Sequence, residues 1–225
     1  MKALKIIGIS LIYLTALQAI KIFSDTDTPD TPNTPLPPSS NNNQRIVQAV
    51  KDTFSIDATQ ERNINLIIDA FYQYGDGDKN KLFYILASVR HESRFKPVRE
   101  CFATSDYAAR NCVKNRSYGY VTNSHVYYGR GFIQITWDSN YIKMTNILGI
   151  DLYNYPDKAL KADIAAEIAV YGMLNGTFTG KKLSDYINAN GRDYYNARRI
   201  VNGTDKATLI KSYTNDMIRN YNKLA

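Results

Sequence analysis

Histidine and cysteine are scarce in this sequence, and their scarcity excludes the common metal and thiol chemistries. The 225 residues include two histidines, His91 and His125, and two cysteines, Cys101 and Cys112. An HExxH motif is absent, because Phe95 stands where its second histidine would be. No CxxC pair occurs, and neither cysteine lies in the signature of a Cys–His peptidase. So few ligands suit a zinc amidase poorly, and the sequence predicts no metal and no organic cofactor.

Runs of basic residues are also missing, although the chain as a whole is basic. Its formal net charge is +7 and its isoelectric point is near 9.2. A basic surface concentrates near polyanions, which include nucleic acids, anionic membranes and anionic polymers of the cell wall. Because the lysines and arginines are scattered along the chain, the sequence disfavours nucleic acid as a partner.

Charge is absent from one apolar stretch near the N-terminus, IIGISLIYLTALQAI at residues 6–20. Lys2 and Lys5 precede this stretch and Lys21 follows it. With the lysines at its ends, residues 3–23 are long enough to span a bilayer, and no well-formed cleavage site is present. We therefore expect residues 1–23 to form an uncleaved signal-anchor helix. The basic N-terminal end predicts that the rest of the chain faces the periplasm, the cell exterior or the interior of a virion membrane.

A proline-rich stretch follows, SDTDTPDTPNTPLPPSSNNNQ at residues 24–44, and it contains five of the seven prolines of the chain. Leu36 is its only large apolar residue. Such a stretch cannot bury enough apolar area to offset the entropy of ordering, so it is expected to be an extended linker. Residues 45–225 then form one domain with a hydrophobic core.

The pattern of apolar residues in this domain predicts a mainly α-helical fold. Between Cys101 and Trp137, where Gly, Asn, Ser and Tyr dominate, we expect long loops with a small hairpin. Cys101 and Cys112 form either a loop-closing disulfide in an exported domain or two inert thiols. Helices are expected at residues 58–75, at residues 80–93, at residues 163–175 with Gly176 as the end, at residues 193–201 and at residues 205–224.

Two glutamates stand near the end of the second predicted helix. Glu92 continues the apolar stripe of Ile85 and Val89, so burial and the negative helix end should disfavour its ionised form. Glu100 lies beyond Pro97, on a loop, and should stay ionised. One protonated and one ionised carboxyl group is the arrangement that a glycosidase uses. The alternative is a buried glutamate in an internal ion pair and an unrelated glutamate on the surface.

The stretch YYGRGFIQITWDSNY at residues 127–141 carries groups that suit a sugar. Short polar side chains can hydrogen-bond hydroxyl and N-acetyl groups, and flat aromatic faces can pack on pyranose rings. Core packing is the alternative role for at least half of the aromatic residues. Gly129 and Gly131 permit close backbone approach, and Arg130 can hold the loop by pairing with a carboxylate. The polar candidates are Gln134, Thr136 and Asn140, and the aromatic candidates include Tyr118, Tyr120, Tyr127, Tyr128 and Trp137.

Together with HES at residues 91–93, this stretch resembles the catalytic core of family 19 glycoside hydrolases. These are chitinases and chitinase-like, peptidoglycan-degrading endolysins of the lysozyme-like superfamily. The resemblance covers about residues 45–225 and implies a two-lobed, mainly α-helical domain. Three further stretches resemble a phage and bacterial branch of the family: FKPVRE at 95–100, FTGKKLSDYI at 178–187 and ARRIVNGTD at 197–205.

The resemblance also implies roles for individual residues. Glu92 matches the proton donor of the family, and Glu100 matches the base that activates water. The chain departs from the family at Arg94, where many members have glycine, and it has no clear counterpart of a later substrate-binding arginine. The residues that match the polar lining of the cleft are Gln134, Thr136, Asn140 and Asn202.

We therefore expect a membrane-tethered cell-wall hydrolase that cleaves β-1,4 bonds between N-acetylated sugars by an inverting acid/base mechanism. Its substrate is peptidoglycan, or alternatively chitin, and its motifs favour a phage-encoded, bacteriolytic enzyme over a bacterial one. A lytic transglycosylase that uses Glu92 alone is the second hypothesis. A non-catalytic wall-binding module is the third.

Overall fold

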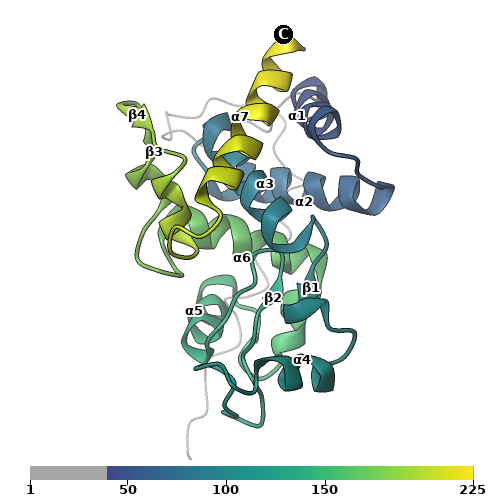
Figure 1. Cartoon of the computed structure of the whole chain (residues 1–225), viewed down its shortest axis with the longest axis vertical. Helices are drawn as coiled ribbons and strands as arrows, with labels where there is room; N and C mark the ends of the chain where they lie inside the picture. The colour runs from purple at the N-terminus through teal and green to yellow at the C-terminus, as the bar shows by residue number, and fades with distance from the viewer. Residues whose placement is uncertain (1–39, 225) are drawn as a thin grey trace, which may run out of the picture. The chain divides into compact units, whose positions relative to one another are not determined.

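The computed structural model describes residues 40–224, and helices make up most of this part of the chain (Figure 1). The predicted mainly helical fold is confirmed. The expected membrane segment and residues 24–39 of the expected linker lie outside the described residues. Among residues 40–224, no helix has the length and apolar character needed to cross a bilayer. The α-helices are α1 (Ser40–Thr53), α2 (Ala58–Tyr74), α3 (Lys79–Ser93), α4 (Asp106–Val113), α5 (Asp138–Leu148), α6 (Ala162–Asn175) and α7 (Ala207–Lys223).

Helix α1 begins at Ser40, which corrects the expected end of the linker at residue 44. Its first turn is polar, so it has no apolar pattern from which to predict a helix there. An asparagine side chain in this turn instead contacts other helices. Asn42 Nδ2 donates a hydrogen bond to the Tyr72 hydroxyl at 3.1 Å, and its Oδ1 accepts one from Tyr221 at 2.7 Å. The domain therefore includes at least five residues that composition alone assigns to the linker.

Helix α3 is buried through most of its length rather than along one face. Residues 81–89 are all buried, and α3 contacts α2, α6 and α7. Asp78 begins the helix by accepting a hydrogen bond from the Asn80 backbone amide. Arg94, with a φ of 54° in the left-handed region, ends it three residues before Pro97. Glu92 consequently sits in the last turn of the helix that occupies the centre of the core.

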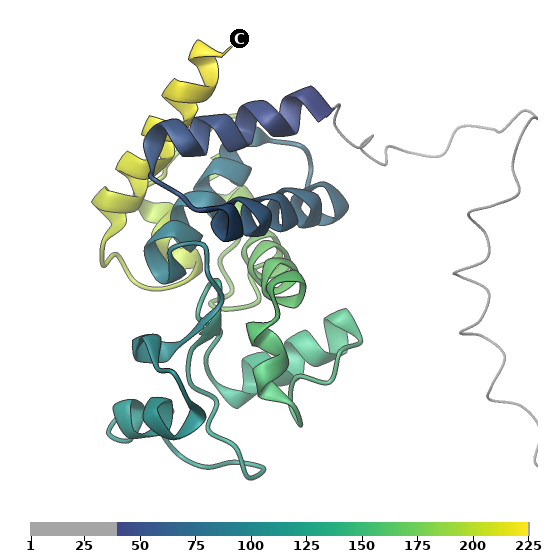
Figure 2. The ribbon, with the colours of Figure 1, turned by 90° about the vertical axis from the view of Figure 1, so that its right-hand side faces the viewer.

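Helices α2 and α6 pack against each other and end where the sequence predicts (Figure 2). A capping box begins α2, in which Asp57 and Gln60 each accept a hydrogen bond from the other's backbone amide. Gly75 ends α2 by donating its amide proton to Phe71. Gly176 ends α6 with a φ of 72°, a conformation that glycine adopts without a steric penalty. The apolar faces of these two helices supply a large part of the core.

The segment between Cys101 and Trp137 has more structure than the sequence predicts. Helix α4 lies within it, begun by the side chain of Ser105, and a disulfide between Cys101 and Cys112 joins this helix to the short 3₁₀ helix η1 (Glu100–Phe102). The pairing confirms the disulfide alternative. Helix α5, directly after Trp137, was not predicted either.

A tight antiparallel bridge between Thr122 and His125 agrees with the small hairpin expected in this segment. Strand β1 (Val98–Arg99) pairs antiparallel with β2 (Arg130–Gly131) across thirty intervening residues, so this pair is a long-range contact that was not predicted. A further hairpin is formed by β3 (Ile187–Asn188) and β4 (Gly191–Arg192). A polar loop sequence gives no register for pairing of this kind, because strands of two residues carry no alternating pattern.

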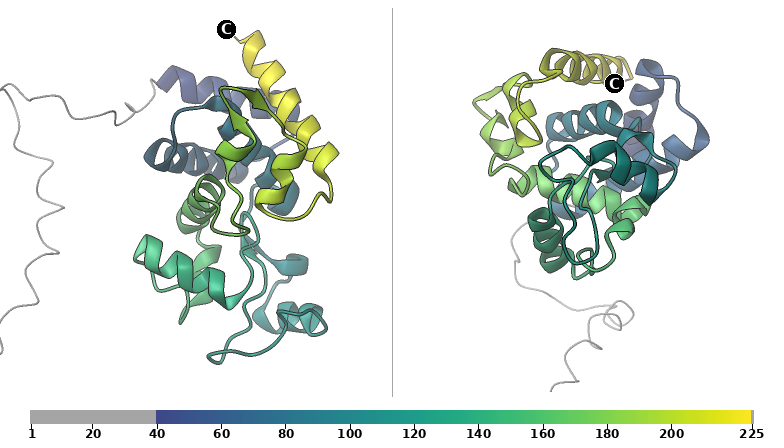
Figure 3. Two further views of the ribbon diagram at one scale, coloured as in Figure 1. Left: turned by 90° about the vertical axis from the view of Figure 1, so that its left-hand side faces the viewer. Right: turned by 60° about the horizontal axis from the view of Figure 1, so that its bottom comes forward.

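The C-terminal part contains one long helix and one short one. Helix α7 confirms the prediction for residues 205–224, and it packs against α1 and α3. The helix expected at residues 193–201 is the short 3₁₀ helix η4 (Asn196–Ile200). Two further 3₁₀ helices are η2 (Pro156–Leu160) and η3 (Leu183–Asp185). The segment from η3 to η4 lies beside α7 (Figure 3).

Arg130 is a buried cation that joins three segments of the domain. Its residue is 1% exposed. Its Nε donates to Asp157 Oδ1 at 2.8 Å, and its Nη2 lies 3.4 Å from Asp106 Oδ1. Arg99 Nη2 contacts the other oxygen of Asp157 at 2.6 Å. The expectation that Arg130 pairs with a carboxylate is confirmed, and two carboxylates share the task.

The remaining donors of Arg130 bind the chain around it. Its Nη1 donates to the carbonyl oxygens of Val126 and Tyr128 at 3.1 and 3.3 Å, and it lies 3.3 Å from the Tyr141 hydroxyl. The guanidinium group also lies 3.6 Å from the centre of the Tyr128 ring. These contacts hold the backbone of residues 126–130 in one conformation.

We predict that Asp157→Asn destabilises the domain, because the variant removes one charge that compensates buried Arg130. Burial by itself would raise the pKa of Asp157, but hydrogen bonds from Arg99 and Arg130 outweigh it and hold that pKa below its usual range. The contribution to stability is therefore present above the unfolded pKa of about 3.9 and disappears as the pH falls through the lower folded value.

Urea unfolding at neutral pH should show a loss of roughly 1–2 kcal/mol in the variant. This difference should shrink at about pH 2, where the wild-type carboxyl group is also protonated. Asp69→Asn, at an exposed position of α2, is the control and should change little. Equal stability of wild type and Asp157→Asn at neutral pH would contradict the structural role of this ion pair.

Candidate active site

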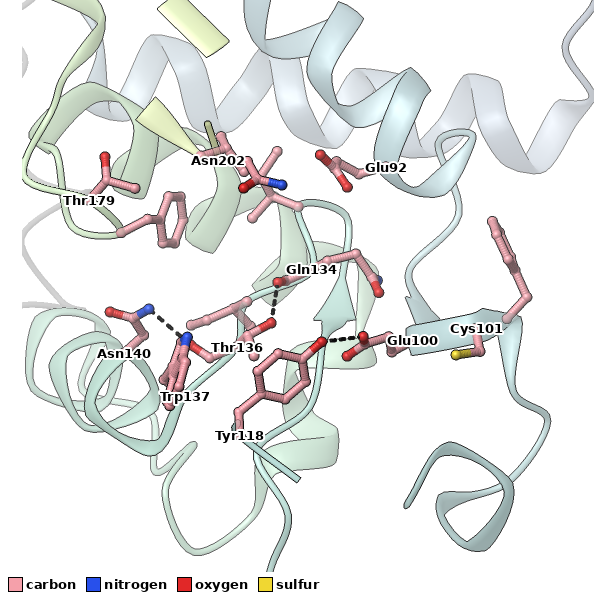
Figure 4. A pocket seen from close by; sticks show the side chains of 15 residues that line it. Glu92, Glu100, Cys101, Tyr118, Gln134, Thr136, Trp137, Asn140, Thr179 and Asn202 are labelled. Carbon is pink, nitrogen blue, oxygen red and sulfur yellow. Dashed lines mark hydrogen bonds between the residues drawn. The ribbon is translucent and has the colours of Figure 1, made fainter. Parts of the chain in front are cut away.

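A cleft of about 470 Å³ gathers residues from separate parts of the sequence (Figure 4). Glu92 reaches it from the last turn of α3, and Glu100 reaches it from η1. Cys101 and Phe102 also come from η1, Tyr118 comes from the loop after α4, and Asn140 comes from α5. The loop before α5 contributes residues 133–137, and the loops after α6 and η4 contribute the rest. The lining consists of Glu92, Glu100, Cys101, Phe102, Tyr118, Ile133, Gln134, Ile135, Thr136, Trp137, Asn140, Phe178, Thr179, Val201 and Asn202.

Seven of the eight predicted site residues line this one cleft: Glu92, Glu100, Gln134, Thr136, Trp137, Asn140 and Asn202. They come from three regions that are remote in the sequence, so their convergence is a result of the fold. The alternative is borne out in part, because Glu92 does pair with a buried arginine, Arg198, but both glutamates line the same cleft.

Tyr128 is the predicted site residue that the structure does not bring to the cleft. Its side chain is completely buried, and its hydroxyl donates a hydrogen bond to Asp106 at 2.8 Å. The ring lies under the guanidinium group of Arg130. The prediction that Tyr128 contacts substrate is therefore wrong, because the position is one of core packing around a buried cation.

Glu92 is held by an arginine that is distant in the sequence. Arg198 Nη1 donates to Glu92 Oε1 at 2.6 Å, and the side chains are 2% and 17% exposed. Arg198 Nε is fixed in turn by the Asp205 carbonyl oxygen at 3.0 Å. The expected burial of Glu92 is thus accompanied by a buried cation, which the sequence analysis did not identify although it quoted the stretch that contains Arg198.

Among the described residues, His91 forms no hydrogen bond or ion pair with the neighbouring Glu92. Burial lowers the pKa of His91, and the charge of Arg198 acts in the same direction, while the charge of Glu92 opposes both. A lowered pKa favours the neutral imidazole at physiological pH. Arg198 is therefore the cation that neutralises Glu92.

Glu100 is held by neutral donors instead. Its Oε1 accepts a hydrogen bond from the Tyr118 hydroxyl at 2.5 Å, and its Oε2 accepts one from the Gly129 amide at 2.8 Å. Burial and the contact with Glu100 raise the pKa of Tyr118 to about 12, so this phenol stays protonated and keeps donating at neutral pH. Hydrogen bonds of this kind stabilise a carboxylate in its ionised form.

Gly129 makes the close approach possible. Its carbonyl oxygen accepts the Glu100 amide proton at 2.7 Å, so the two residues exchange two hydrogen bonds. A Cβ atom at Gly129 would lie 2.8 Å from Gln134 Oε1 and 3.2 Å from Glu100 Oε2. Only glycine leaves room here for both side chains.

The polar residues on the cleft floor are fixed by backbone contacts. Gln134 Nε2 donates to the carbonyl oxygens of Val98 and Gly131 at 3.0 and 3.1 Å. Thr136 Oγ1 donates to the Gln134 carbonyl at 2.9 Å, and Asn140 Nδ2 donates to the Thr136 carbonyl at 2.9 Å. Because their donors are used internally, these side chains are rigid and keep oxygen atoms available as acceptors.

Aromatic and apolar residues form other parts of the wall. Trp137 is 39% exposed and packs edge-to-face against Tyr118, with ring centres 5.5 Å apart. The sequence analysis missed Phe102, which is 56% exposed, and it missed Phe178 and Thr179. Phe178 and Thr179 lie in the stretch FTGKKLSDYI at residues 178–187, and the family resemblance of this stretch is the signal that could have identified them.

Thr179 connects two loops of the cleft wall, because its hydroxyl contacts the carbonyl oxygens of Arg199 and Ile200 at 2.8 and 3.0 Å. The ring of Phe178 lies where a Cβ atom of Gly172 would be, with a gap of 2.1 Å. These contacts place the loop after α6 against α6 itself. Residues 40–224 contain no cluster of His, Cys, Asp and Glu that could hold a metal ion.

Two glutamates in a cleft lined by amides, a hydroxyl group and aromatic rings are the constellation of a glycoside hydrolase. Residues 92–185 match the family model described as chitinase class I, a model of glycoside hydrolase family 19. The match confirms, over this part of the chain, the resemblance found in the sequence, and it supports a glycosidase. No curated protein matches the chain.

Solved structures of chitinases resemble the chain at low sequence identity. The structure of chitinase C from Streptomyces griseus HUT6037 has a TM-score of 0.50 at 20% identity, over 80% of this chain and 72% of the chitinase. A bacterial family 19 chitinase gives 0.49 at 18%, over 82% and 93%. A mutant of chitinase C gives 0.48 at 18%, over 81% and 90%. The first of these shows that the fold is shared.

We predict that Tyr118→Phe lowers the turnover rate while the domain stays folded. The variant keeps the ring that packs on Trp137 but removes the hydrogen bond to Glu100. A hydrogen bond to a charged group is worth about 1.5–3 kcal/mol, which corresponds to a rate loss of roughly 10- to 100-fold. Turnover of a soluble oligosaccharide and a thermal melt are the measurements.

Tyr120→Phe is the matched control, since Tyr120 is 46% exposed and lies outside the cleft lining. It should retain the activity of the wild type. Full activity of a folded Tyr118→Phe variant would show that the contact with Glu100 has no part in turnover.

Proposed function

We propose that this protein hydrolyses β-1,4 bonds between the N-acetylated sugars of peptidoglycan and inverts the anomeric configuration. The observation that carries the proposal is the different environment of two glutamates in one cleft. Glu92 is paired with a buried arginine, and Glu100 accepts two hydrogen bonds from neutral donors. The two carboxyl groups reach one cleft from separate elements and each is held in position, as a mechanism with one acid and one base requires.

Glu100 serves as the general base in this proposal. Its two hydrogen bonds favour the carboxylate and fix its orientation without a formal positive charge beside it. A carboxylate in such a setting can take a proton from water as the water attacks the anomeric carbon. Thr136, on the floor of the same cleft, has a hydroxyl oxygen that can accept a hydrogen bond from that water.

Glu92 serves as the general acid. Arg198 can only donate hydrogen bonds, and its Nη1 occupies Oε1 of Glu92. A proton on Glu92 therefore belongs on Oε2, and the arginine restricts the rotation of the carboxyl group. After the proton passes to the leaving sugar oxygen, Arg198 stabilises the carboxylate that remains.

The rest of the cleft supports recognition of N-acetylated sugars. Gln134 and Asn140 present amide oxygens at fixed positions. Asn202 is exposed, and its Oδ1 accepts a hydrogen bond from the Gly203 amide at 2.8 Å, so its side-chain NH₂ group is the part that can donate to a ligand. The exposed ring of Trp137 offers a flat apolar face to a pyranose. Several such residues along one cleft suit a polymer better than a single sugar.

Peptidoglycan is preferred over chitin because of charge. Peptidoglycan carries carboxylates on its muramic acid and peptide parts, whereas chitin is neutral, and a chain with a net charge of +7 concentrates on a polyanion. The disulfide between Cys101 and Cys112 agrees with a domain that works outside the cytoplasm. The phage-like stretches favour a phage enzyme that opens the host wall.

A lytic transglycosylase is the second candidate. The ion pair of Glu92 with Arg198 suits a reaction in which Glu92 is the single catalytic residue as well as it suits a reaction with two carboxyl groups. Such an enzyme needs no base for water and releases an anhydro sugar instead of a reducing end. Mass spectrometry of digested peptidoglycan distinguishes the two reactions, because the anhydro product is lighter by one water molecule.

We predict that Glu92→Gln and Glu100→Gln each lower peptidoglycan hydrolysis by about 10²- to 10⁴-fold, because each removes one proton transfer. Binding to cell walls should change little in both variants, and so should the thermal melt of Glu100→Gln. Glu92→Gln should melt at a lower temperature, because buried Arg198 then lacks the carboxylate that pairs with it. Glu61→Gln, on α2 and outside the lining of the cleft, is the control and should keep full activity. Release of reducing ends is the measurement for all three.

Wild-type hydrolysis by a folded Glu100→Gln variant would refute the two-carboxylate mechanism and favour the transglycosylase. Chitin cleavage without any release from peptidoglycan would move the substrate to chitin. Wall binding with no cleavage by the wild type would favour the non-catalytic module.

The attachment to a membrane is part of the proposal and rests on the apolar stretch at residues 3–23. We predict that the full chain sediments with membranes and resists extraction with high salt, because burial of a mostly apolar stretch of about twenty residues is not weakened by salt. Extraction by detergent should release it. Recovery of the full-length chain in the soluble fraction would contradict the anchor.

A further inference from the structure

A second cavity, of about 590 Å³, shares no lining residue with the candidate active site. Its wall consists of Asp106 and Arg110 of α4, the loop at Ser124 and His125, Arg130, residues 154–158 and Lys161. These elements meet at the end of the domain where α4 lies (Figure 1). We call it the Tyr155 cavity.

The two carboxylates in the wall of the Tyr155 cavity are already paired. Asp106 lies 2.6 Å from Arg110 Nε and 3.4 Å from Arg130 Nη2. Asp157 lies 2.8 Å from Arg130 Nε and 2.6 Å from Arg99 Nη2. Three guanidinium groups therefore face two carboxylates, and the paired groups alone leave one positive charge in excess.

Two lysines add to this excess. Within residues 40–224, no carboxylate comes within ion-pair distance of Lys158 or Lys161. The charge of Lys158 contributes to lowering the pKa of Asp151, after the hydrogen bonds that Asp151 accepts from Asn154. Lys161 is also the N-cap of α6, where no side chain caps the helix, so the positive end of the helix dipole adds to its charge.

An exposed aromatic ring stands beside the lysines. Tyr155 is 60% exposed, although it lies next to buried Pro156. The ammonium group of Lys158 lies 4.7 Å from the centre of its ring. A flat ring at this exposure can pack on the apolar face of a sugar, while the ammonium groups bind an anionic group of the same ligand. Ser124, His125 and Asn154 supply polar groups on the same wall.

We propose that the Tyr155 cavity is a second binding site, for glycan that carries carboxylates, and that it retains the enzyme on its substrate. A sugar ring packs on Tyr155, and the carboxylate lies between Lys158 and Lys161. The source of this ligand rests on the proposed function, because peptidoglycan carries such carboxylates and chitin does not. The site itself rests on the charge, exposure and shape of the cavity.

Amine labelling of the full chain tests the site directly. The Glu92→Gln variant is treated with an acylating reagent, with and without a soluble disaccharide-peptide of peptidoglycan, and the labelled lysines are quantified by mass spectrometry. Lys158 and Lys161 should be protected several-fold. Lys211 and Lys223, both exposed on α7, are internal controls and should label equally in both samples.

Three further ligands define the chemistry that the cavity recognises. The same disaccharide-peptide with its carboxylates amidated and a neutral N-acetylglucosamine tetramer should give no protection. A glycerol phosphate polymer of the teichoic acid type separates phosphate from carboxylate as the anion. Protection by the phosphate polymer alone would overturn the proposal in favour of a phosphate site.

Variants test the consequence for retention. Lys158→Ala with Lys161→Ala should weaken binding of the Glu92→Gln chain to insoluble peptidoglycan about tenfold, as expected for the loss of two exposed ion pairs. Tyr155→Ala should weaken it at high salt as well, where the charge contribution is screened. The pair Lys211→Ala and Lys223→Ala removes the same charge elsewhere and should bind as the parent does.

Equal labelling of Lys158 and Lys161 with and without the acidic ligand would overturn the site. Equal losses in the two double-lysine variants would show that net charge, and no particular cavity, retains the protein. Failure of the proposed function has another signature, since the wild type would then release nothing from peptidoglycan while protection of Lys158 and Lys161 by the acidic fragment persisted.

Discussion

The buried guanidinium group of Arg130 is the constraint on which the active-site loop depends. Two carboxylates compensate its charge, and its remaining donors bind the carbonyl oxygens of Val126 and Tyr128. The carbonyl group of Tyr128 and the amide group of Gly129 belong to one planar peptide unit, so the contact of Arg130 with the carbonyl also fixes the amide. The amide proton of Gly129 then points to Glu100. A charge in the core thereby determines where a carboxylate in the cleft can sit.

Two different sets of contacts hold the two glutamates. Glu92 pairs with a cation that lies 106 residues away in the sequence, so its position depends on the docking of η4 against the end of α3. Glu100 depends on neutral donors at Tyr118 and Gly129 and on a loop that the disulfide at Cys101 ties to α4. The cleft therefore contains one glutamate that is paired with a cation and one that is not.

Charge is distributed unevenly between the two cavities. No lysine or arginine lines the cleft that holds the glutamates, whereas the Tyr155 cavity is lined by three arginine and lysine side chains besides Arg130. A cation in contact with the sugar would disfavour the positive charge that develops on it during cleavage. Keeping the basic groups on a separate wall lets an anionic polymer be held without this penalty.

The sequence determined the elements whose signals are local. The apolar spacing and terminal glycines of α2 and α6 were identifiable from neighbouring residues. Glu92, Glu100 and the polar residues before α5 were identifiable as candidates for a site through motifs that resemble a known family. Only the tertiary structure decided the start of α1, the pairing of β1 with β2, the burial of Tyr128 and the contact of Arg198 with Glu92. Each of these depends on a partner remote in sequence, and residue type alone does not specify which partner a buried side chain meets.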